Sequence, residues 1–526
     1  MTRKWLMLGF VLMMVISFSF SANAWTGRMA GMGNPYGLVE DESDFLFHPA
    51  LITQGKGIAL YGDLGFSYNK LKWSGSSTFA EFLSEGGDVG SNAIDVKGHE
   101  WVANTRLGIT FPAYSGRMGV FLGYSGNTLS KGKYTGSNST DFDYTYTNDL
   151  PQSHKYTNET ASFPEFRFIY AQPLNGKLKL GGEFGITYRE EKLESSFSAG
   201  DDTISNFSPF MNHSGQVYMV PFQVPYNSKY WDATLKGSVE TQIGPSTLSF
   251  TPYYGTIIDG RNRFDYNASL YDSYNDNIMA KGSIHGWRVG GELWWRFPVS
   301  SNSTVPVLLR VERGSKKRTG TSNGSLDGYD VSAIDTYVFS SRERNLTIEF
   351  GPGINALIGN GNRVAAGIYY GFSKKKTDFD AVEWDEGEDL CDSTNYNGIP
   401  DSKEHRVTLK GSGEFAISPV FSLTSGLNLF YSKVKNNYSF YFENDLRQAA
   451  WNMKGHAWGI GASIGAIYKL NQLSVEPYIN GGYQRLRMSG NGWNTNDSDD
   501  YGSGTITARQ KKSLWNVGTG FAIKFN

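Results

Sequence analysis

The sequence predicts an all-β protein, folded as a transmembrane antiparallel β-barrel of about 16 strands, with ~14–18 possible. Three observations lead there. Aromatic residues make up 15% of the 526 residues and glycine occupies 62 positions, a composition typical of strands and turns. Apolar and polar residues alternate along segment after segment. The connections between these segments alternate between short and long, as periplasmic turns and extracellular loops do in outer-membrane barrels.

Composition also excludes several classes of protein. Only 39% of residues are hydrophobic and 19% are charged, which excludes a protein of many transmembrane helices. The 49 Lys and Arg nearly balance the 51 Asp and Glu, so we expect no nucleic-acid partner. Cys391 is the single cysteine. A disulfide framework and a cysteine-based metal or haem site are therefore excluded, and we expect no cofactor and no metal.

The N-terminus predicts a cleaved secretory signal over residues 1–24. Arg3 and Lys4 precede an apolar run over residues 5–20, and Ala22-Asn23-Ala24 has the small-x-small pattern of a cleavage site. The alternative is a membrane anchor, but the apolar run is short for a membrane span. We expect the mature chain to begin at Trp25 and to be exported to the cell outer membrane.

Each predicted strand has one apolar and one polar face. Over residues 177–189, Leu178, Phe184 and Ile186 lie on one face, and Lys179 and Glu183 lie on the other. Sixteen such segments are predicted at residues 57–70, 99–113, 116–130, 160–173, 177–192, 229–243, 246–264, 285–298, 305–316, 338–356, 362–374, 404–418, 420–434, 456–469, 473–488 and 511–525. The barrel domain is therefore predicted to span residues 57–526.

Seven short connections are predicted to be turns at one end of the barrel. They lie at residues 112–116, 172–176, 244–246, 299–303, 359–362, 418–419 and 471–472. The connections between them are much longer and polar. In outer-membrane barrels the short turns and both termini are periplasmic, and we expect the same orientation here.

Aromatic residues on the apolar faces recur at a spacing of ten. The pairs are Trp101 and Phe111, Trp287 and Phe297, Phe421 and Tyr431, Trp458 and Tyr468, and Trp515 and Phe525. Ten tilted strand residues rise roughly 25 Å, the height of the apolar band between two aromatic girdles. Residues 515–526 resemble the C-terminal strand by which such barrels are recognised for assembly, although Asn526 follows the usual terminal aromatic residue. Expected partners are outer-membrane lipid, lipopolysaccharide, the barrel assembly machinery and small solutes.

The polar faces predict a charged, water-containing lumen, because this many inward ions need either water or an opposite charge. The predicted pore-lining residues are Arg106, Arg167, Lys179, Glu183, Asp232, Lys236, Glu240, Asp259, Arg261, Arg288, Glu292, Arg296, Arg310, Glu312, Glu349, Arg406, Lys410 and Glu414. Two interpretations stay open. The ions form cross-strand pairs that stiffen the wall, or cations and anions oppose each other and orient polar solutes. The wall formed by other strands is smooth, as at Gly459, Gly461, Ser463 and Gly465.

An acidic loop is predicted over residues 378–401, which hold nine Asp and Glu and no Lys or Arg. Asp497, Asp499 and Asp500 add to the predicted acidic rim. Residues 395–401 partly resemble calcium-binding loops with glycine at the turn. Most of the carboxylates of such a loop are replaced, which favours a solvated acidic loop without metal.

Residues 25–56 precede the first predicted strand and begin with Gly31-Met32-Gly33-Asn34-Pro35. An acidic, serine and aromatic run then leads to His48-Pro49-Ala50. This stretch resembles the N-terminal hatch of FadL-type outer-membrane transporters, with Asp44, His48, Pro49 and Ala50 as the hatch-like residues. His48 stands where that family has Asn. The resemblance implies a segment that folds into the lumen and restricts it, whereas the alternative is a periplasmic leader that enters the first strand.

The sequence thus predicts a porin-like channel for passive diffusion of small hydrophilic solutes or ions. The alternative is a hatch-gated, FadL-type transporter of hydrophobic compounds. A more remote alternative is a hydrolase built on the barrel rim near His99, His405 and His456, but none of the seven histidines lies in a recognisable catalytic or metal motif. We therefore expect no enzymatic activity.

Overall fold

The computed structural model describes residues 27–81, 89–139, 153–199, 202–204, 226–270, 274–324, 335–359, 361–384, 391–442, 447–496 and 504–525. The predicted signal sequence at residues 1–24 and the acidic residues Asp497, Asp499 and Asp500 lie outside the described residues.

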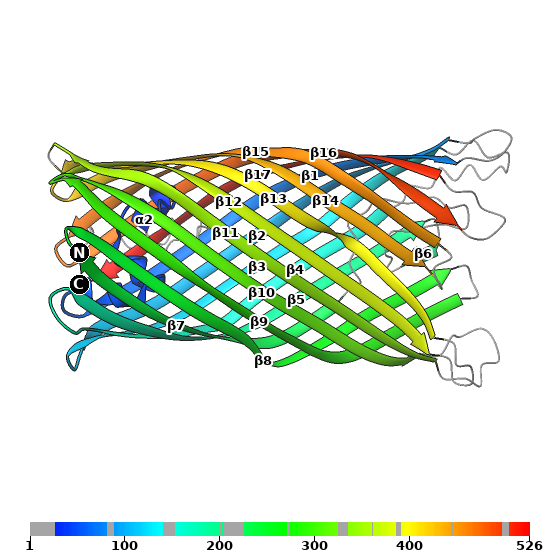
Figure 1. Cartoon of the computed structure of the whole chain (residues 1–526), viewed down its shortest axis with the longest axis horizontal. Coiled ribbons are helices and arrows are strands. Elements are labelled where there is room, and N and C mark those ends of the chain that lie inside the picture. Colours follow the sequence, from blue (N-terminus) through cyan, green and yellow to red (C-terminus); the bar gives the residue numbers. More distant parts are fainter. Residues whose placement is uncertain are drawn as a thin grey trace, which may run out of the picture.

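The described chain forms a single antiparallel sheet that closes on itself (Figure 1). Its strands are β1 (Ala59–Glu81), β2 (Val89–Ala113), β3 (Gly116–Ser139), β4 (Ser153–Pro173), β5 (Leu178–Ala199), β6 (Asp202–Ile204), β7 (Tyr226–Ile243), β8 (Ser246–Leu270), β9 (Tyr274–Ser300), β10 (Ser303–Gly324), β11 (Asp335–Ile358), β12 (Asn362–Trp384), β13 (Cys391–Ser418), β14 (Phe421–Phe442), β15 (Arg447–Leu470), β16 (Leu473–Asn496) and β17 (Gly504–Phe525).

The barrel is closed because β1 pairs with both β2 and β17. The three-residue β6 pairs only with the end of β5 and is not part of the wall. The wall therefore has the predicted 16 strands, and the predicted fold class is confirmed. Most wall strands have 21 or more residues, roughly twice what a tilted strand needs to cross a bilayer. The barrel consequently continues well beyond the apolar band.

The seven predicted turns all connect neighbouring strands at one end of the barrel. Each is short, as between β2, which ends at Ala113, and β3, which begins at Gly116. In Figure 1 these turns and both marked ends of the chain lie together at the left end of the barrel. This is the periplasmic end in the orientation of outer-membrane barrels.

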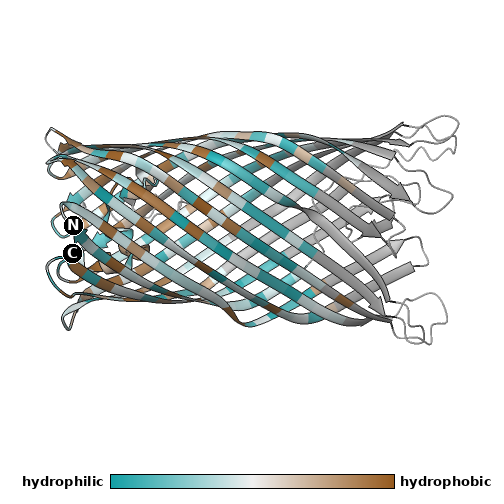
Figure 2. Ribbon diagram, viewed as in Figure 1, coloured by the Kyte–Doolittle hydropathy of each residue, from teal (hydrophilic) through white to brown (hydrophobic). Residues whose placement is uncertain are grey.

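The outer face of the periplasmic half is apolar and exposed. Many large hydrophobic residues there have over a third of their surface accessible, among them Leu107, Ile354, Ile464 and Val517. Apolar and hydrophilic positions alternate along the strands in Figure 2. Exposure of so many apolar side chains around a closed sheet fits contact with lipid. Among the described residues, no helix is long and apolar enough to span a membrane.

The predicted acidic loop at residues 378–401 is mostly strand, which corrects the sequence interpretation. β12 continues to Trp384 and β13 begins at Cys391. Asp378 lies on β12, where it forms ion pairs with Arg344 and, at 2.8 Å, with Lys376. Residues 395–401 belong to β13, and an extended strand lacks the tight turn that a calcium loop needs.

A β-bulge in β8 corrects two predicted pore-lining residues. The register of β8 against β9 shifts between Thr256 and Arg261, and Asp259 has a φ of 46°. One extra residue in a strand makes the side chains after it point to the opposite face from the one that the alternation predicts. Asp259 is therefore exposed in the bulge. Arg261 faces outward together with Arg263, whereas Asn262 and Phe264 are buried on the inner face.

Candidate functional site

Residues 27–56 lie inside the lumen at the periplasmic end, and we call them the lumenal segment. It contains the short helix α2 (Gly27–Gly31) and the 3-10 turns η1 (Glu42–Leu46) and η2 (Pro49–Gln54). Figure 1 shows α2 enclosed by the strands. Contacts join α2 to β14–β17 and η2 to β3, β4, β5 and β7. The segment therefore reaches walls on different sides of the lumen.

An apolar cluster holds the lumenal segment against the wall. From the segment it contains Met32, Tyr36, Leu38, Val39, Phe45, Leu46, Leu51 and Ile52, and from the wall Ala59, Tyr61, Phe121, Ile169, Ala171, Trp294, Leu308, Ala365 and Tyr369. Most of these side chains are almost completely buried. Such a cluster stabilises docking of the segment, because each large apolar side chain removed from water contributes about 1.5–3 kcal/mol.

The smooth wall predicted from glycine and serine is where the backbone of the lumenal segment approaches most closely. A Cβ atom on Gly426 would lie 2.2 Å from the Met32 carbonyl oxygen, and one on Gly465 would lie 3.0 Å from Cα of Gly31. Ser463 donates a hydrogen bond to the Gly31 carbonyl (2.9 Å). The small side chains thus make room for the segment.

Arg28 anchors the beginning of the segment. Its guanidinium group forms ion pairs with Asp41 and, at 2.7 Å, with Glu414 on β13, while its backbone N–H donates to Glu476 on β16 (2.9 Å). Burial acts to lower the pKa of Arg28, but the two carboxylates outweigh it and raise the pKa above its ordinary value. Arg28 therefore links the start of the segment to Asp41 further along it and to β13 and β16 of the wall.

The charged wall holds the other half of the segment. Arg296 on β9 forms ion pairs with Glu40 (2.7 Å) and with Glu240 on β7 (2.7 Å). Lys236 on β7 donates to the Leu46 carbonyl oxygen (2.8 Å). The Trp294 indole N–H donates to the Gly37 carbonyl oxygen (3.1 Å). Backbone groups of the segment thus receive partners from the wall, as buried polar groups require.

A polar network lies at the centre of the interface. The Tyr36 hydroxyl donates to Glu292 on β9, and the ring nitrogens of His48 lie 3.1 Å from that hydroxyl and 2.6 Å from the Thr251 hydroxyl. Burial lowers the pKa of His48 to about 4. His48 is therefore neutral near pH 7, and its two ring nitrogens bridge the Tyr36 and Thr251 hydroxyls.

The other predicted hatch-like residues lie close to this network. Asp44 is fully buried and accepts a hydrogen bond from the Asp41 N–H (2.8 Å), forming a capping box at the start of η1. Burial and the nearby Asp41 raise the pKa of Asp44 well above its usual range. Pro49 begins η2, and the Ala50 backbone packs so closely on β5 that a Cβ atom on Gly181 would lie 2.4 Å from it.

Most predicted pore-lining residues face the lumen and have partners of opposite charge. The ion pairs are Arg167 with Glu165 and Glu183, Lys179 with Glu240, Lys236 with Glu183, Arg288 with Asp232, Arg296 with Glu240, Arg310 with Glu292 and Glu349, Arg406 with Glu404, and Glu414 with Arg28. Tyr253 donates to Glu312 (2.7 Å), the Lys410 ammonium lies 4.6 Å from the Tyr369 ring centre, and Arg106 is half-buried opposite Asp63.

This arrangement favours one of the two interpretations of the charged lumen. Cations and anions alternate on neighbouring strands and are joined in pairs, as Arg310 is to Glu292 (3.1 Å) and to Glu349 (3.7 Å). Opposed walls of unpaired charge would leave each ion facing water. The paired geometry fits a wall that is stiffened by cross-strand ion pairs.

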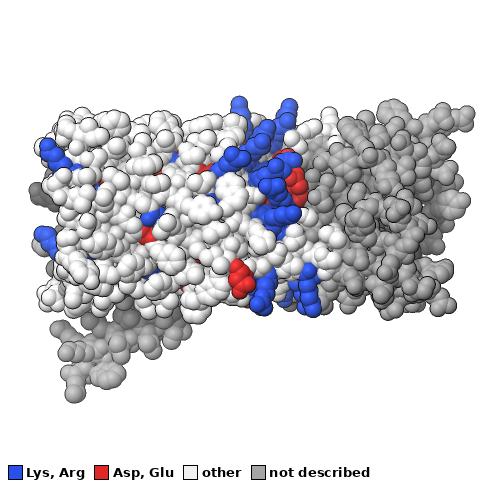
Figure 3. Space-filling model, turned by 60° about the horizontal axis from the view of Figure 1, so that its bottom comes forward, with Lys and Arg blue, Asp and Glu red and all other residues white. Residues whose placement is uncertain are grey.

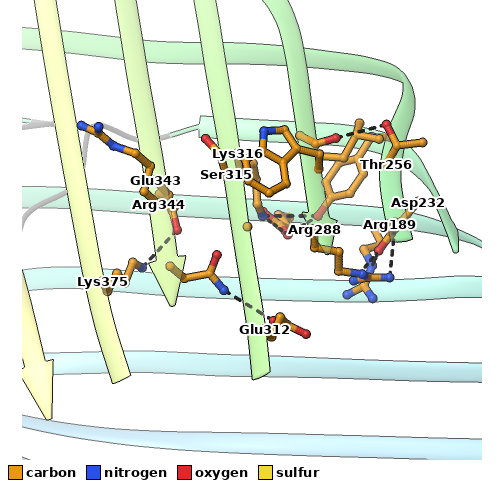
Figure 4. Close-up of a pocket in the computed structure, with 18 residues that line it drawn as sticks. Arg189, Asp232, Thr256, Arg288, Glu312, Ser315, Lys316, Glu343, Arg344 and Lys375 are labelled. Carbon is orange, nitrogen blue, oxygen red and sulfur yellow. Dashed lines mark hydrogen bonds and ion pairs between the residues drawn. The ribbon is translucent and has the colours of Figure 1, made fainter. Parts of the chain in front are cut away.

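Beyond the lumenal segment, toward the long-loop end, the charged wall holds a cavity of about 340 Å³. Figure 4 shows Arg189 and Arg288 pointing toward Asp232 (3.2 and 3.1 Å), and Lys375 pointing toward Glu343 (3.1 Å). Tyr230 and Ile257 also line the cavity. It therefore offers both ionic and aromatic surface to a solute.

Sequence reasoning missed two groups of residues at this site. Arg28 and Glu40 lie in the predicted hatch region but belong to no motif, and Tyr36 lies in its glycine-rich start without being one of the predicted hatch-like residues. Glu191, Lys316 and Glu343 line the cavity and form an ion-paired layer with Arg318, whose side chain is only 2% exposed. Glu191, Lys316 and Glu343 lie within predicted strands, and Arg318 lies two residues past one. The signal for this second group was therefore the same alternation that selected the pore-lining residues.

The three histidines considered for a rim site face outward rather than into the lumen. His99, His405 and His456 each accept or donate a hydrogen bond with a girdle tyrosine of the neighbouring strand, namely Tyr68, Tyr370 (2.7 Å) and Tyr431 (2.6 Å). They lie on different strands as parts of the outer face. Among the described residues, no group of three or more His, Cys, Asp or Glu could hold a metal ion.

Comparisons with known proteins give one partial family match. An autotransporter β-domain model matches residues 342–525, less than half of the chain. No curated protein sequence matches. Solved structures with similar folds include a TodX monoaromatic hydrocarbon channel mutant (TM-score 0.44, 10% identity, 95% of this chain and 98% of that chain), the Pseudomonas putida toluene transporter TodX (0.40, 10%, 96% and 100%) and a Pseudomonas aeruginosa FadL homologue (0.39, 10%, 96% and 99%).

The closed sheet and its apolar outer face establish where this chain resides. A closed barrel satisfies every backbone hydrogen bond of a membrane-spanning sheet, and its aromatic girdles mark the two interfaces. Trp101, Trp458 and Trp515 are each over 40% exposed on the outer face, as are Tyr468 and Phe525 at the other end of the band. The chain is a bacterial outer-membrane β-barrel protein.

Proposed function

We propose that this chain is a gated outer-membrane transport channel, with residues 27–56 as a hatch that closes the periplasmic end of its lumen. The observation that carries the proposal is the lumenal segment itself, which packs against walls on different sides of the barrel. Transport in this proposal requires the hatch to move or rearrange. An open porin-like channel is less well supported, because free diffusion needs a water-filled lumen along its whole length.

Hydrophobic small compounds are the first cargo class that we propose. The wall side chains covered by the hatch include a group of apolar and aromatic residues, namely Phe121, Ile169, Trp294, Leu308 and Tyr369. Displacement of the hatch would open a passage lined by these groups. An apolar compound gains free energy there, because its surface leaves water for an apolar environment.

Small hydrophilic solutes are the second cargo class, favoured by a different observation. The cavity above the hatch is lined by the ion pairs of Asp232 and Glu343. Paired ions present both donors and acceptors of hydrogen bonds to a polar solute. A solute of this class would bind in the cavity before the hatch opens.

Uptake by whole cells distinguishes the two cargo classes. Phospholipid vesicles would not serve, because apolar compounds cross a plain phospholipid bilayer without a protein. Cells whose outer membrane contains lipopolysaccharide would express either the full chain or no barrel, and uptake of radiolabelled toluene and of a disaccharide would be measured. Faster toluene uptake with unchanged disaccharide uptake supports the first class. The reverse pattern supports the second, and no acceleration of either rules out transport of both.

A further inference from the structure

A belt of basic side chains lies on the outer face of the barrel, on the extracellular side of the aromatic girdle. Figure 3 shows Lys and Arg gathered in a band across one face, next to a nearly uncharged surface toward the periplasmic end. On β13–β17 the outward-facing members with exposed or half-buried side chains are Lys403, His405, Lys433, Lys435, Lys454, His456, Arg485, Arg487, Arg509 and Lys511.

The strand register brings these basic side chains side by side. His405 pairs with Lys433, Lys433 with His456, His456 with Arg487, and Arg487 with Lys511. The next row places Lys403 opposite Lys435 and Lys435 opposite Lys454. Four strand spacings of about 4.8 Å give the first row a span of roughly 19 Å.

Within the described part of the chain, none of the Lys and Arg members on β13–β17 forms an ion pair. The contrast with β11 and β12 is clear, since Arg344 and Lys376 both contact Asp378 there. Like charges placed directly opposite one another destabilise a sheet. Anions from outside the chain would relieve that repulsion.

The belt lies at the height of lipid headgroups. Lys433 follows the girdle residue Tyr431 by two positions, and His456 precedes Trp458 by two, which is a rise of roughly 5 Å along a tilted strand. The Tyr431 hydroxyl and Nδ1 of His456 are 2.6 Å apart, so the ring is fixed at this level. A groove of about 720 Å³ lies among the same side chains, lined by Lys433, Lys454, Arg487 and Lys511 among others.

We propose that this basic surface on β13–β17 binds the phosphate groups of lipopolysaccharide in the outer leaflet. Lipopolysaccharide carries its phosphates on a glycolipid headgroup directly above the acyl chains, where the belt begins. Several cations in a row match a ligand with more than one phosphate, whereas one phosphodiester would engage only part of the row. The site is independent of the lumen and of the proposed transport.

Native mass spectrometry of the purified full-length chain in non-ionic detergent tests this site. The probes are bisphosphorylated lipid A, monophosphorylated lipid A and phosphatidylglycerol. The test variant K433Q/R487Q/K511Q removes three cations of one row. The matched control K56Q/K177Q/K469Q removes three exposed lysines from the periplasmic end, where the structure gives none of them an ion pair.

The site predicts tightest binding of bisphosphorylated lipid A and about tenfold weaker binding by the test variant. The control should stay within about twofold of the wild type, and the charge-conserving variant K433R/R487K/K511R should retain binding. Circular dichroism confirms that each variant retains its β-sheet. Equal binding by the test variant and wild type, an equal loss in the control, or equally tight binding of phosphatidylglycerol would each overturn the proposal.

Discussion

A single methyl group on the smooth wall should release the lumenal segment. In G426A the new Cβ atom would lie 2.2 Å from the Met32 carbonyl oxygen and 2.4 Å from the Gly33 nitrogen. Both are backbone atoms, so a side-chain rotation cannot relieve the clash. Overpacking of this kind costs about 1–3 kcal/mol. The population of the released segment should therefore rise by about 5- to 140-fold.

Hydrogen exchange measured by mass spectrometry reports this population directly. In G426A, amides of residues 29–52 should exchange faster by that factor, while the barrel strands exchange as in the wild type. The matched control is G461A, also on the inner face of the smooth wall, where the nearest atom to the new Cβ would be 3.7 Å away. Equal exchange of the segment in G426A and the wild type, or an equal increase in G461A, would refute the account of close backbone contact.

Three further predictions concern charge. R28Q leaves Asp41 and Glu414 without their shared cation, which costs about 3–5 kcal/mol for a buried pair. The amides of the lumenal segment should therefore exchange hydrogen at least about 100-fold faster. Unchanged exchange would contradict the anchoring role of Arg28. The pKa of His48 is lowered from 6.5 to about 4 in the docked segment, so the released segment binds more protons between these two pH values. Acidification should therefore favour release by up to about 3 kcal/mol. Hydrogen exchange of H48N at pH 7 and 4.5 should lack this contribution. The third change is E191Q in a chain without residues 27–56, which removes a lumenal anion that pairs with Lys316 and Arg318. The reversal potential measured in a KCl gradient should shift toward the equilibrium potential of chloride. The control E190Q, on the outer face, should leave the reversal potential unchanged.

The barrel could be predicted from the sequence because its main signal is local. Alternation of apolar and polar residues in each strand, together with the seven short turns, requires no knowledge of distant contacts. The signal weakens beyond the membrane, where both faces of a strand are polar. For that reason the prediction ended the ninth strand at Lys316, whereas β10 continues to Gly324, and residues near Asp378 looked like a loop.

Two features of the site, the bulge at Asp259 and the contacts of the lumenal segment, could not be predicted from local sequence patterns. The bulge at Asp259 adds one residue without interrupting the polar pattern, so the change of face at Arg261 leaves no local trace. The contacts of the lumenal segment join residues far apart in the chain, as Arg28 and Glu414 are. The resemblance to a hatch singled out the segment, but nothing local assigned glycines such as Gly426 to the surface that receives it.

Gating of the lumen is the central claim, and planar-bilayer recording tests it most directly. The full-length chain and a chain lacking residues 27–56 would be reconstituted separately and recorded at the same voltage and salt concentration. The account predicts that the full-length chain is closed for most of the recording, and that the shortened chain shows stable, ohmic steps whose size depends on salt. Equal conductance of the two chains would contradict it.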